Sequence, residues 1–187
     1  MSDLKIAVIV GSTRPGRHGR DVADWVLAQA TGRESATYEI VDLADHPLPL
    51  LDELLPAAMG QYEHEHTKAW SATIAKYDGF VFVTPEYNHS IPAVLKNAID
   101  YLAIEWQNKA AAFAGYGFLG ASRAVEHLRN MLSQLQVAHV SANLALSMIY
   151  DFEAMTTFAP GDHNIEAAAT MFDQLEAWAT ALKPLRD

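Results

Sequence analysis

Two polar segments, each placed directly after an apolar run, contain the residues best suited to chemistry. Residues 11–17 read GSTRPGR and follow the apolar residues 4–10. Hydroxyls, arginines and a glycine turn before a helix suit a phosphate, because the amides and dipole of a helix N-terminus favour an anion. The segment is neither a GxxxxGK[ST] loop nor a GxGxxG loop, which argues against nucleoside triphosphate hydrolysis. A glycine turn with exposed arginines is the alternative interpretation.

The second segment, residues 84–93, reads TPEYNHSIPA and follows the apolar run 79–83. A plain turn needs one or two residues of these types, and this loop has many more. A third loop, residues 115–120, reads GYGFLG and follows the apolar residues 110–114. The order and placement of these loops depend on the elements that carry them.

Those elements alternate between strand and helix. Apolar or alternating runs predict strands at residues 4–10, 36–41, 79–83 and 110–114, with a fifth inside 137–146. Helical patterns lie within residues 22–30, 66–77, 92–102, 125–135 and 165–182, and residues 45–62 and 148–163 are expected to be irregular. Successive strand–helix units predict an α/β fold with a doubly wound parallel sheet and helices on both faces, in a single domain covering residues 1–187.

A five-stranded sheet of this kind has the order 2-1-3-4-5. Its first and third strands are neighbours, and the chain winds in opposite directions from them, so ligands bind in the crevice at their carboxyl ends. Loops 11–17 and 84–92 both open into that crevice, and loop 115–120 lies beside it. Segments far apart in the sequence therefore converge on one predicted site.

Composition narrows the class of protein. The chain has 187 residues, 50% of them hydrophobic, with no cysteine and a formal net charge of −10. The charge argues against a nucleic-acid or anionic-membrane surface, and the lack of cysteine excludes disulfides and thiolate chemistry. With no membrane span and no signal-peptide pattern, we expect a cytoplasmic protein. Arg14, Arg17 and Arg20, with His18 between them, form a local basic cluster in this acidic chain.

The motifs resemble those of the NAD(P)H-dependent FMN reductase family, a branch of the flavodoxin-like superfamily. The likeness rests on GSTRPGR at 11–17, PEYNHSIPAVLKNAIDYL at 85–102 and GYGFLGASRAVEHLR at 115–129, and extends over about residues 4–145. The last motif departs from the family pattern SYGxxGGxRA, because Gly115 stands for the serine and Ala121 for the second glycine. Arg123 matches the arginine of that pattern. The resemblance implies a flavodoxin-like fold.

Carried over position by position, the resemblance implies an FMN site. The phosphate would be held by Ser12, Thr13, Arg14 and Arg17. One edge of the isoalloxazine ring would lie against Pro85, Glu86, Tyr87 and Asn88, and the loop with Tyr116, Gly117 and Gly120 would hold its other side. Glu86 is expected to position the ring, because hydride transfer to a flavin needs no proton abstraction by the enzyme. No side chain is expected to be catalytic.

The resemblance further implies an oxidoreductase. Electrons from NADPH or NADH would pass through FMN to a flavin, quinone, azo compound or similar small acceptor, in ping-pong turnover. A non-enzymatic flavodoxin-type electron carrier and an inactive regulator are the alternatives. A homodimer or homotetramer is implied as well; Tyr101, Leu102, Ile104 and Trp106 are interface candidates, although burial in one chain explains them equally well. Residues 45–65 and 148–163 are expected to shape the acceptor cavity.

Other polar residues have simpler explanations. Residues 63–66 read EHEH, but histidines two positions apart would point to different faces of a helix, so a solvated helix start is favoured over a metal site. Ser12 and Ser90 lack the GxSxG elbow of hydrolases. His89 adjoins the predicted ring site without an assigned role, and Met148 and Met155 are expected in the core or at an oligomer face.

Overall fold

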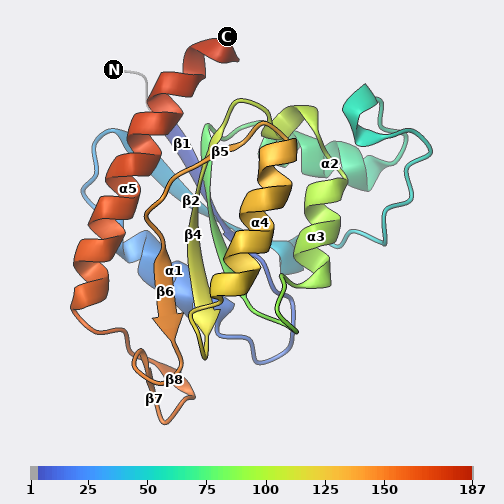
Figure 1. Ribbon diagram of the computed structural model, residues 1–187. Helices are drawn as coiled ribbons and strands as arrows, with labels where there is room; N and C mark the ends of the chain where they lie inside the picture. The colour runs from blue at the N-terminus through green and yellow to red at the C-terminus, as the bar shows by residue number, and fades with distance from the viewer. Residues whose placement is uncertain (1–3, 187) are drawn as a thin grey trace.

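The central sheet has the strand order predicted from the sequence. A computed structural model describes residues 4–186, and its strands run in the order β2-β1-β3-β4-β5 (Figure 1). These strands are β1 (Leu4–Val10), β2 (Ala36–Asp42), β3 (Gly79–Pro85), β4 (Ala110–Gly117) and β5 (Ala138–His139), and all neighbouring pairs are parallel. The doubly wound, flavodoxin-like fold is therefore confirmed.

The fifth strand of the sheet is interrupted. β5 pairs with the start of β4, whereas β6 (Leu144–Ser147) pairs in parallel with its end. Arg129, from helix α4 (Ser122–Gln134), reaches the gap and donates to the carbonyl oxygens of Val140 (2.6 Å) and Ser141 (3.3 Å). Because the Arg129 side chain satisfies these carbonyls, they need no hydrogen bonds from a neighbouring strand. The fifth strand therefore divides into two short pieces.

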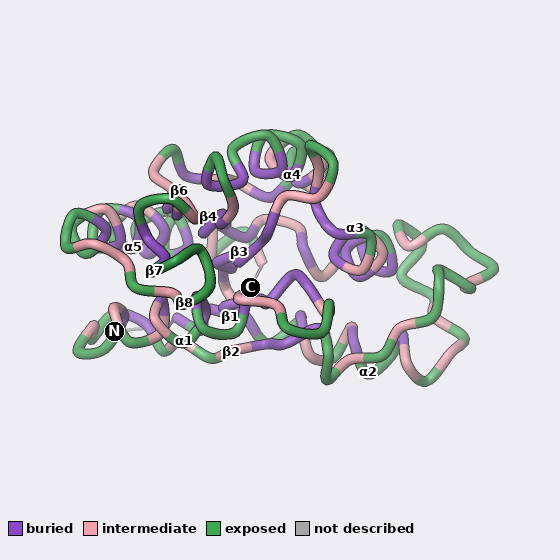
Figure 2. The backbone as a smooth tube through the Cα atoms, turned by 90° about the horizontal axis from the view of Figure 1, so that it is seen from below, coloured by how far each residue is buried: buried purple, intermediate pink, exposed green. Residues whose placement is uncertain are grey.

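Helices cover both faces of the sheet (Figure 2). Helices α1 (Gly19–Gln29) and α5 (His163–Leu182) pack on one face, and α2 (Glu65–Ile74), α3 (Ala93–Asp100) and α4 pack on the other. Side chains alternate between these layers: Val81 and Val83 of β3 face α1 and α5, whereas Phe80 and Phe82 face the opposite layer. Burial on both faces accounts for the continuous apolar runs of the sequence. Within residues 4–186, no helix is both long and apolar enough to cross a bilayer.

Three of the four interface candidates belong to the core of the single chain. Tyr101, Leu102 and Trp106 are all at most 1% exposed and pack with the layer of α2, α3 and α4. Burial within the chain, the alternative considered for these residues, is therefore the correct explanation. Ile104, at the start of the 3-10 helix η3 (Ile104–Trp106), is the exception, because about half of its surface is exposed.

Residues 47–62, here called the arm, project from the body between β2 and α2 (Figure 1). The arm follows the 3-10 helix η1 (Leu43–Asp45) and contains another, η2 (Ala57–Met59), but is otherwise irregular, as expected. Asn97 of α3 tethers it: the amide Nδ2 donates to the oxygen of Pro49 (2.7 Å), and Oδ1 accepts from the N–H of Leu51 (3.0 Å). The arm is thus fixed at its base.

Residues 148–163 are more regular than predicted. They contain an antiparallel pair of short strands, β7 (Phe152–Glu153) and β8 (Thr157–Phe158). The 3-10 helix η4 (Lys183–Leu185) follows α5. The hairpin turn places Ala154 and Met155 at positive φ, although these residue types give no turn signal in the sequence. Buried Asp151 holds the segment by accepting from the N–H of Ser147 and from Asn164 Nδ2, both at 2.7 Å.

Candidate functional site

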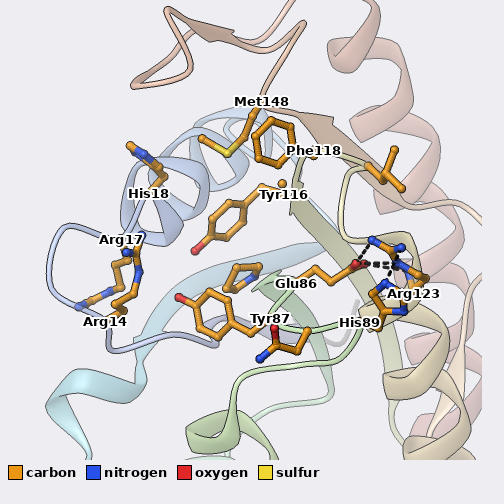
Figure 3. A pocket seen from close by; sticks show the side chains of 14 residues that line it. Arg14, Arg17, His18, Glu86, Tyr87, His89, Tyr116, Phe118, Arg123 and Met148 are labelled. Atoms are coloured by element: carbon orange, nitrogen blue, oxygen red, sulfur yellow. Dashed lines mark hydrogen bonds and ion pairs between the residues drawn. The ribbon is translucent and has the colours of Figure 1, made fainter.

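A cavity of about 370 Å³ lies where the three loops after β1, β3 and β4 converge (Figure 3). Of the residues predicted for the site, Arg14, Arg17, Pro85, Glu86, Tyr87, Asn88, Tyr116 and Gly117 line it, whereas Ser12, Thr13 and Gly120 do not. His18, His89, Phe118, Leu119, Arg123 and Met148 complete the lining. The topology thus brings the predicted loops together, as expected.

Loop 11–17 is fixed against β3. The N–H of Gly11 donates to the oxygen of Val83 (2.8 Å), and a Cβ at this position would lie 3.0 Å from that backbone oxygen, so the close approach favours glycine. Ser12 is buried, and its hydroxyl bonds the hydroxyl of Tyr87 at 2.9 Å. Ser12 therefore joins two walls of the cavity and does not itself line it.

The basic cluster of the sequence is divided by the fold. Arg17 donates to buried Asp42 at the end of β2 (2.6 Å), and its Nε is buried without a partner. Arg20 pairs with Asp24 along α1 (3.0 Å), away from the cavity lining. Arg14 is exposed and has no carboxylate partner among residues 4–186. Arg14 is therefore the cation of this cluster that is available to an anion.

Tyr116 supplies a hydroxyl that the sequence did not single out. The side chain is 5% exposed, and its Oη is buried without a hydrogen-bond partner. It stands beside the start of α1, 2.9 Å from where a Cβ on Gly19 would lie, so a larger residue there would displace it. Burial raises the pKa of Tyr116, which keeps the hydroxyl protonated as a donor. In Figure 3 the hydroxyls of Tyr87 and Tyr116 point toward Arg14 and Arg17.

The loop after β3 forms a tight turn. Tyr87 and Ser90 exchange backbone hydrogen bonds of 2.9 and 3.0 Å, and Asn88 and His89 between them have φ of 51° and 69°. Positive φ at both central residues is the mark of a type I′ turn, which glycine or asparagine usually favours. The turn presents a short, flat stretch of backbone at the cavity.

The side chain of Glu86 points toward the first turn of α4. Its carboxylate accepts from Arg123 Nε (2.6 Å) and from the N–H groups of Arg123 (3.2 Å) and Ala124 (3.4 Å). Burial acts to raise the pKa of Glu86, but these donors outweigh it and lower the pKa overall. A carboxylate with a lowered pKa and several donors suits a structural role and not proton transfer.

One part of the cavity lining is apolar. Phe118 and Leu119, more than 60% exposed, and partly buried Met148 border it. Phe118 and Leu119 lie between Gly117 and Gly120, whose φ values of 149° and 59° form the turn that presents them. None of residues 45–65 lines this cavity, so their expected part in shaping an acceptor cavity stays a prediction. Met148 is the contribution of the later segment.

The EHEH segment differs from its helical interpretation. His64 precedes α2 in extended conformation, and its ring stacks on that of His66 at 5.1 Å, with both near Asp52 of the arm. The two histidines therefore share one side, because His64 is not part of the helix. Among residues 4–186, no three His, Asp or Glu side chains are arranged to hold a metal ion.

Comparison with known proteins identifies the family of this chain. The family described as NADPH-dependent FMN reductase matches residues 4–151. The chain belongs to this family. It is 43% identical over 148 residues to the NAD(P)H-dependent FMN reductase ntnL of a Nectria species, covering 76% of this chain and 74% of the relative. It is also 34% identical over 144 residues to a 2-hydroxy-1,4-benzoquinone reductase of a Burkholderia species, covering 72% and 73%.

Among solved structures, the flavoenzyme NAD(P)H:acceptor oxidoreductase FerB from Paracoccus denitrificans superposes with a TM-score of 0.73 and 24% identity, covering 95% of this chain and 98% of that one. This likeness bears on the fold alone. Family membership makes the protein an enzyme, an FMN-dependent oxidoreductase that uses NAD(P)H. The alternatives of a non-enzymatic carrier and an inactive regulator are not supported.

The residues present fit FMN. The cofactor has a dianionic phosphate, a chain of hydroxyls and a planar ring, and the cavity offers matching groups. Arg17 Nε and Tyr116 Oη are buried donors without partners, and Arg14, which pairs with no carboxylate of residues 4–186, lines the same cavity. Burying a polar atom unsatisfied is costly, so donors left in this state indicate a bound acceptor.

Proposed function

We propose that the cavity binds FMN and that the enzyme reduces quinone-type acceptors with electrons from NADPH or NADH. The observation that carries this proposal is the pair of unpartnered buried donors beside Arg14, at one end of a cavity whose other border is apolar. Such a site has a polar end for a phosphate and an apolar mouth for a planar, uncharged substrate.

Specific residues would hold the cofactor. Arg14 supplies free charge to the phosphate, with Arg17 and Tyr116 donating beside it. Asp42 fixes the fork of Arg17 at 2.6 Å, so this side chain needs no further ordering on binding. Ser12, Thr13 and Gly120 shape the loops without lining the cavity. Residues 85–88 and Gly117 form the wall for the ring.

When bound, FMN supplies two-electron redox chemistry between nicotinamide and acceptor. The protein contributes binding and orientation, and no side chain of the cavity is assigned proton transfer. Phe118, Leu119 and Met148 offer an apolar, aromatic surface at the mouth, which suits quinones better than metal oxyanions. Because nicotinamide and acceptor use the same mouth, they bind in turn.

Absorbance spectroscopy and anaerobic titration test this function. The purified protein, or the apoprotein reconstituted with FMN, should show the visible flavin band, and NADPH or NADH should bleach it. Addition of 1,4-benzoquinone should restore the band, and initial rates with both substrates varied should give the parallel reciprocal plots of ping-pong turnover. If neither NADPH nor NADH bleaches the band, the reductase function is refuted. If the band bleaches but does not recover on adding benzoquinone, the choice of acceptor is refuted.

The proposal includes a homodimer formed through the arm. Leu50 and Leu54 are 84% and 80% exposed, an unusual state for neighbouring leucines on a projecting segment. Ile104 extends this surface, since its Cδ1 lies 2.5 Å from where a Cβ on Gly60 would be. A second copy presenting the same apolar arm would cover these side chains.

Light scattering coupled to size exclusion tests the dimer. We expect the wild type to elute as a dimer or larger species, and the double variant Leu50→Ser, Leu54→Ser to shift toward monomer. Leu185→Ser is the matched control, because Leu185 is 63% exposed in η4, outside the arm. A double variant with the same mass as the wild type would exclude the arm as the interface.

A further inference from the structure

One side chain at the cavity contacts both the ring wall and the helix behind it. Arg123, in the first turn of α4, donates through Nε to Glu86 (2.6 Å) and lies with its NH1 2.9 Å from His89 Nε2. A guanidinium has donors only, so His89 Nε2 must accept, which requires a neutral imidazole. Figure 3 shows Glu86, His89 and Arg123 in contact at one side of the cavity.

The same helix holds the next residue of the turn. His127, one helical turn after Arg123, has its Nδ1 3.1 Å from the hydroxyl of Ser90. Residues i and i+4 of a helix share a face, so Arg123 and His127 together hold the turn 87–90 against α4. His89 also has φ of 69°, a conformation that the type I′ turn requires and that costs energy for most residues other than glycine.

We propose that Arg123 and His89 form a positioning clasp that shapes the ring wall and that opens when His89 is protonated. This inference rests on the proposed function, because the clasp matters through the affinity for FMN. Each nitrogen of the Arg123 guanidinium already has a partner: Glu86 accepts from Nε and pairs with NH2, and His89 accepts from NH1. It acts through the turn 87–90 and does not act on the reacting atoms.

Acid opens the clasp for two reasons. A protonated imidazole has no lone pair for Arg123, and it places a second positive charge 2.9 Å from the guanidinium. Glu86 is the only carboxylate in contact with Arg123 among residues 4–186. Its oxygens already accept from the Arg123 guanidinium and from two backbone N–H groups of α4. The other titratable or charged groups of the cavity lining are His18, Arg14, Arg17, Tyr87 and Tyr116, and α4 also carries Glu126 and His127 within about one helical turn of Arg123.

FMN affinity of the apoprotein, measured by quenching of flavin fluorescence from pH 5.5 to 8, tests the clasp. Arg123→Gln should weaken binding about tenfold at pH 8, the size expected for losing a charge-assisted contact. Lys68→Gln, which removes the charge of an exposed lysine paired with Glu65 on α2, is the matched control and should bind like the wild type.

His89→Asn separates the clasp from a general loss of structure. Asparagine tolerates positive φ and offers Arg123 an oxygen that does not protonate, so its affinity at pH 8 should stay within about twofold of the wild type. At pH 5.5 it should bind FMN several-fold more tightly than the wild type. The ligand and every other side chain are the same in both proteins, so the ratio of the two dissociation constants isolates His89.

The outcomes are distinct. A ratio that stays constant from pH 8 to 5.5 would overturn the protonation step, and wild-type affinity in Arg123→Gln would overturn the clasp. Should Arg123→Gln fail to fold by circular dichroism, the His89→Asn ratio still decides. A wild-type protein that binds no FMN at any pH would instead refute the proposed function, and the clasp with it.

Discussion

Arg14 and Arg17 carry the same charge, but different neighbours hold them. Asp42 accepts from Arg17 at 2.6 Å, whereas Arg14 has no carboxylate partner in the described part of the chain. We therefore expect Arg14→Ala to raise the dissociation constant of FMN on the order of 10- to 100-fold, from losing a contact of about 1.5–3 kcal/mol. Titration of the apoprotein with FMN and with riboflavin measures this. Riboflavin has no phosphate, so an equal loss for both ligands would show that Arg14 does not bind the phosphate.

Single residues show where prediction from sequence stops. Residue type and position after a strand indicated the cavity-lining side chains well, because loops at this edge of a parallel sheet must face one crevice. They did not indicate which atoms would be engaged. The hydroxyl of Ser12 bonds Tyr87, far away in sequence, and Tyr116 contributes a buried hydroxyl, although its loop was expected to hold the ring. Contacts between distant segments decide these roles, and no local pattern encodes them.

The loop joining β4 to α4 departs from the family motif at two positions that touch. A Cβ on Gly115 would lie 2.4 Å from the oxygen of Gly120 and 3.0 Å from Ala121 Cβ, and Ala121 itself has φ of 53°. A glycine at position 121 would remove the second of these contacts but not the first. We expect Gly115→Ser to be less destabilising in an Ala121→Gly background, by about 1 kcal/mol of coupling. Urea unfolding of the four proteins of this cycle measures it, and additive effects would show that the positions are independent.

Long elements were predictable and short ones were not. β1, β3 and β4 are buried on both faces, so their apolar runs were unmistakable, and the strand order followed from topology. The break between β5 and β6 depends on Arg129 reaching across from α4 to the carbonyl of Val140. The β7–β8 hairpin depends on Ala154 and Met155 at positive φ, residues that carry no turn signature. Such features come from tertiary contacts that override local preference.

For the molecule as a whole, stability at alkaline pH is expected to depend on the end of the sheet opposite the cavity. Lys109, just before β4, is buried, and its Nζ donates to the oxygen of Ile74 at 2.9 Å. Burial, with repulsion from Arg186, lowers the pKa of Lys109 to about 8, against about 10.4 for an unfolded chain. The unfolded state therefore binds more protons between these values, so the free energy of unfolding rises as pH increases from about 8 to 10. Tyr77, whose pKa burial raises to about 12, acts in the opposite direction above about pH 10.

Replacing Lys109 by methionine should remove this pH dependence. The full effect of the lysine is about 3 kcal/mol, and Lys109→Met should be more stable than the wild type at pH 7 because no charge is buried. The oxygen of Ile74 keeps a partner, the N–H of Tyr77 at 3.3 Å, so the variant leaves no carbonyl unsatisfied. Urea unfolding of the apoprotein at pH 7, 8, 9 and 10 measures the slope, and Lys68→Met, at an exposed site, should keep the wild-type slope. If Lys109→Met keeps it as well, a group other than Lys109 governs stability in this range.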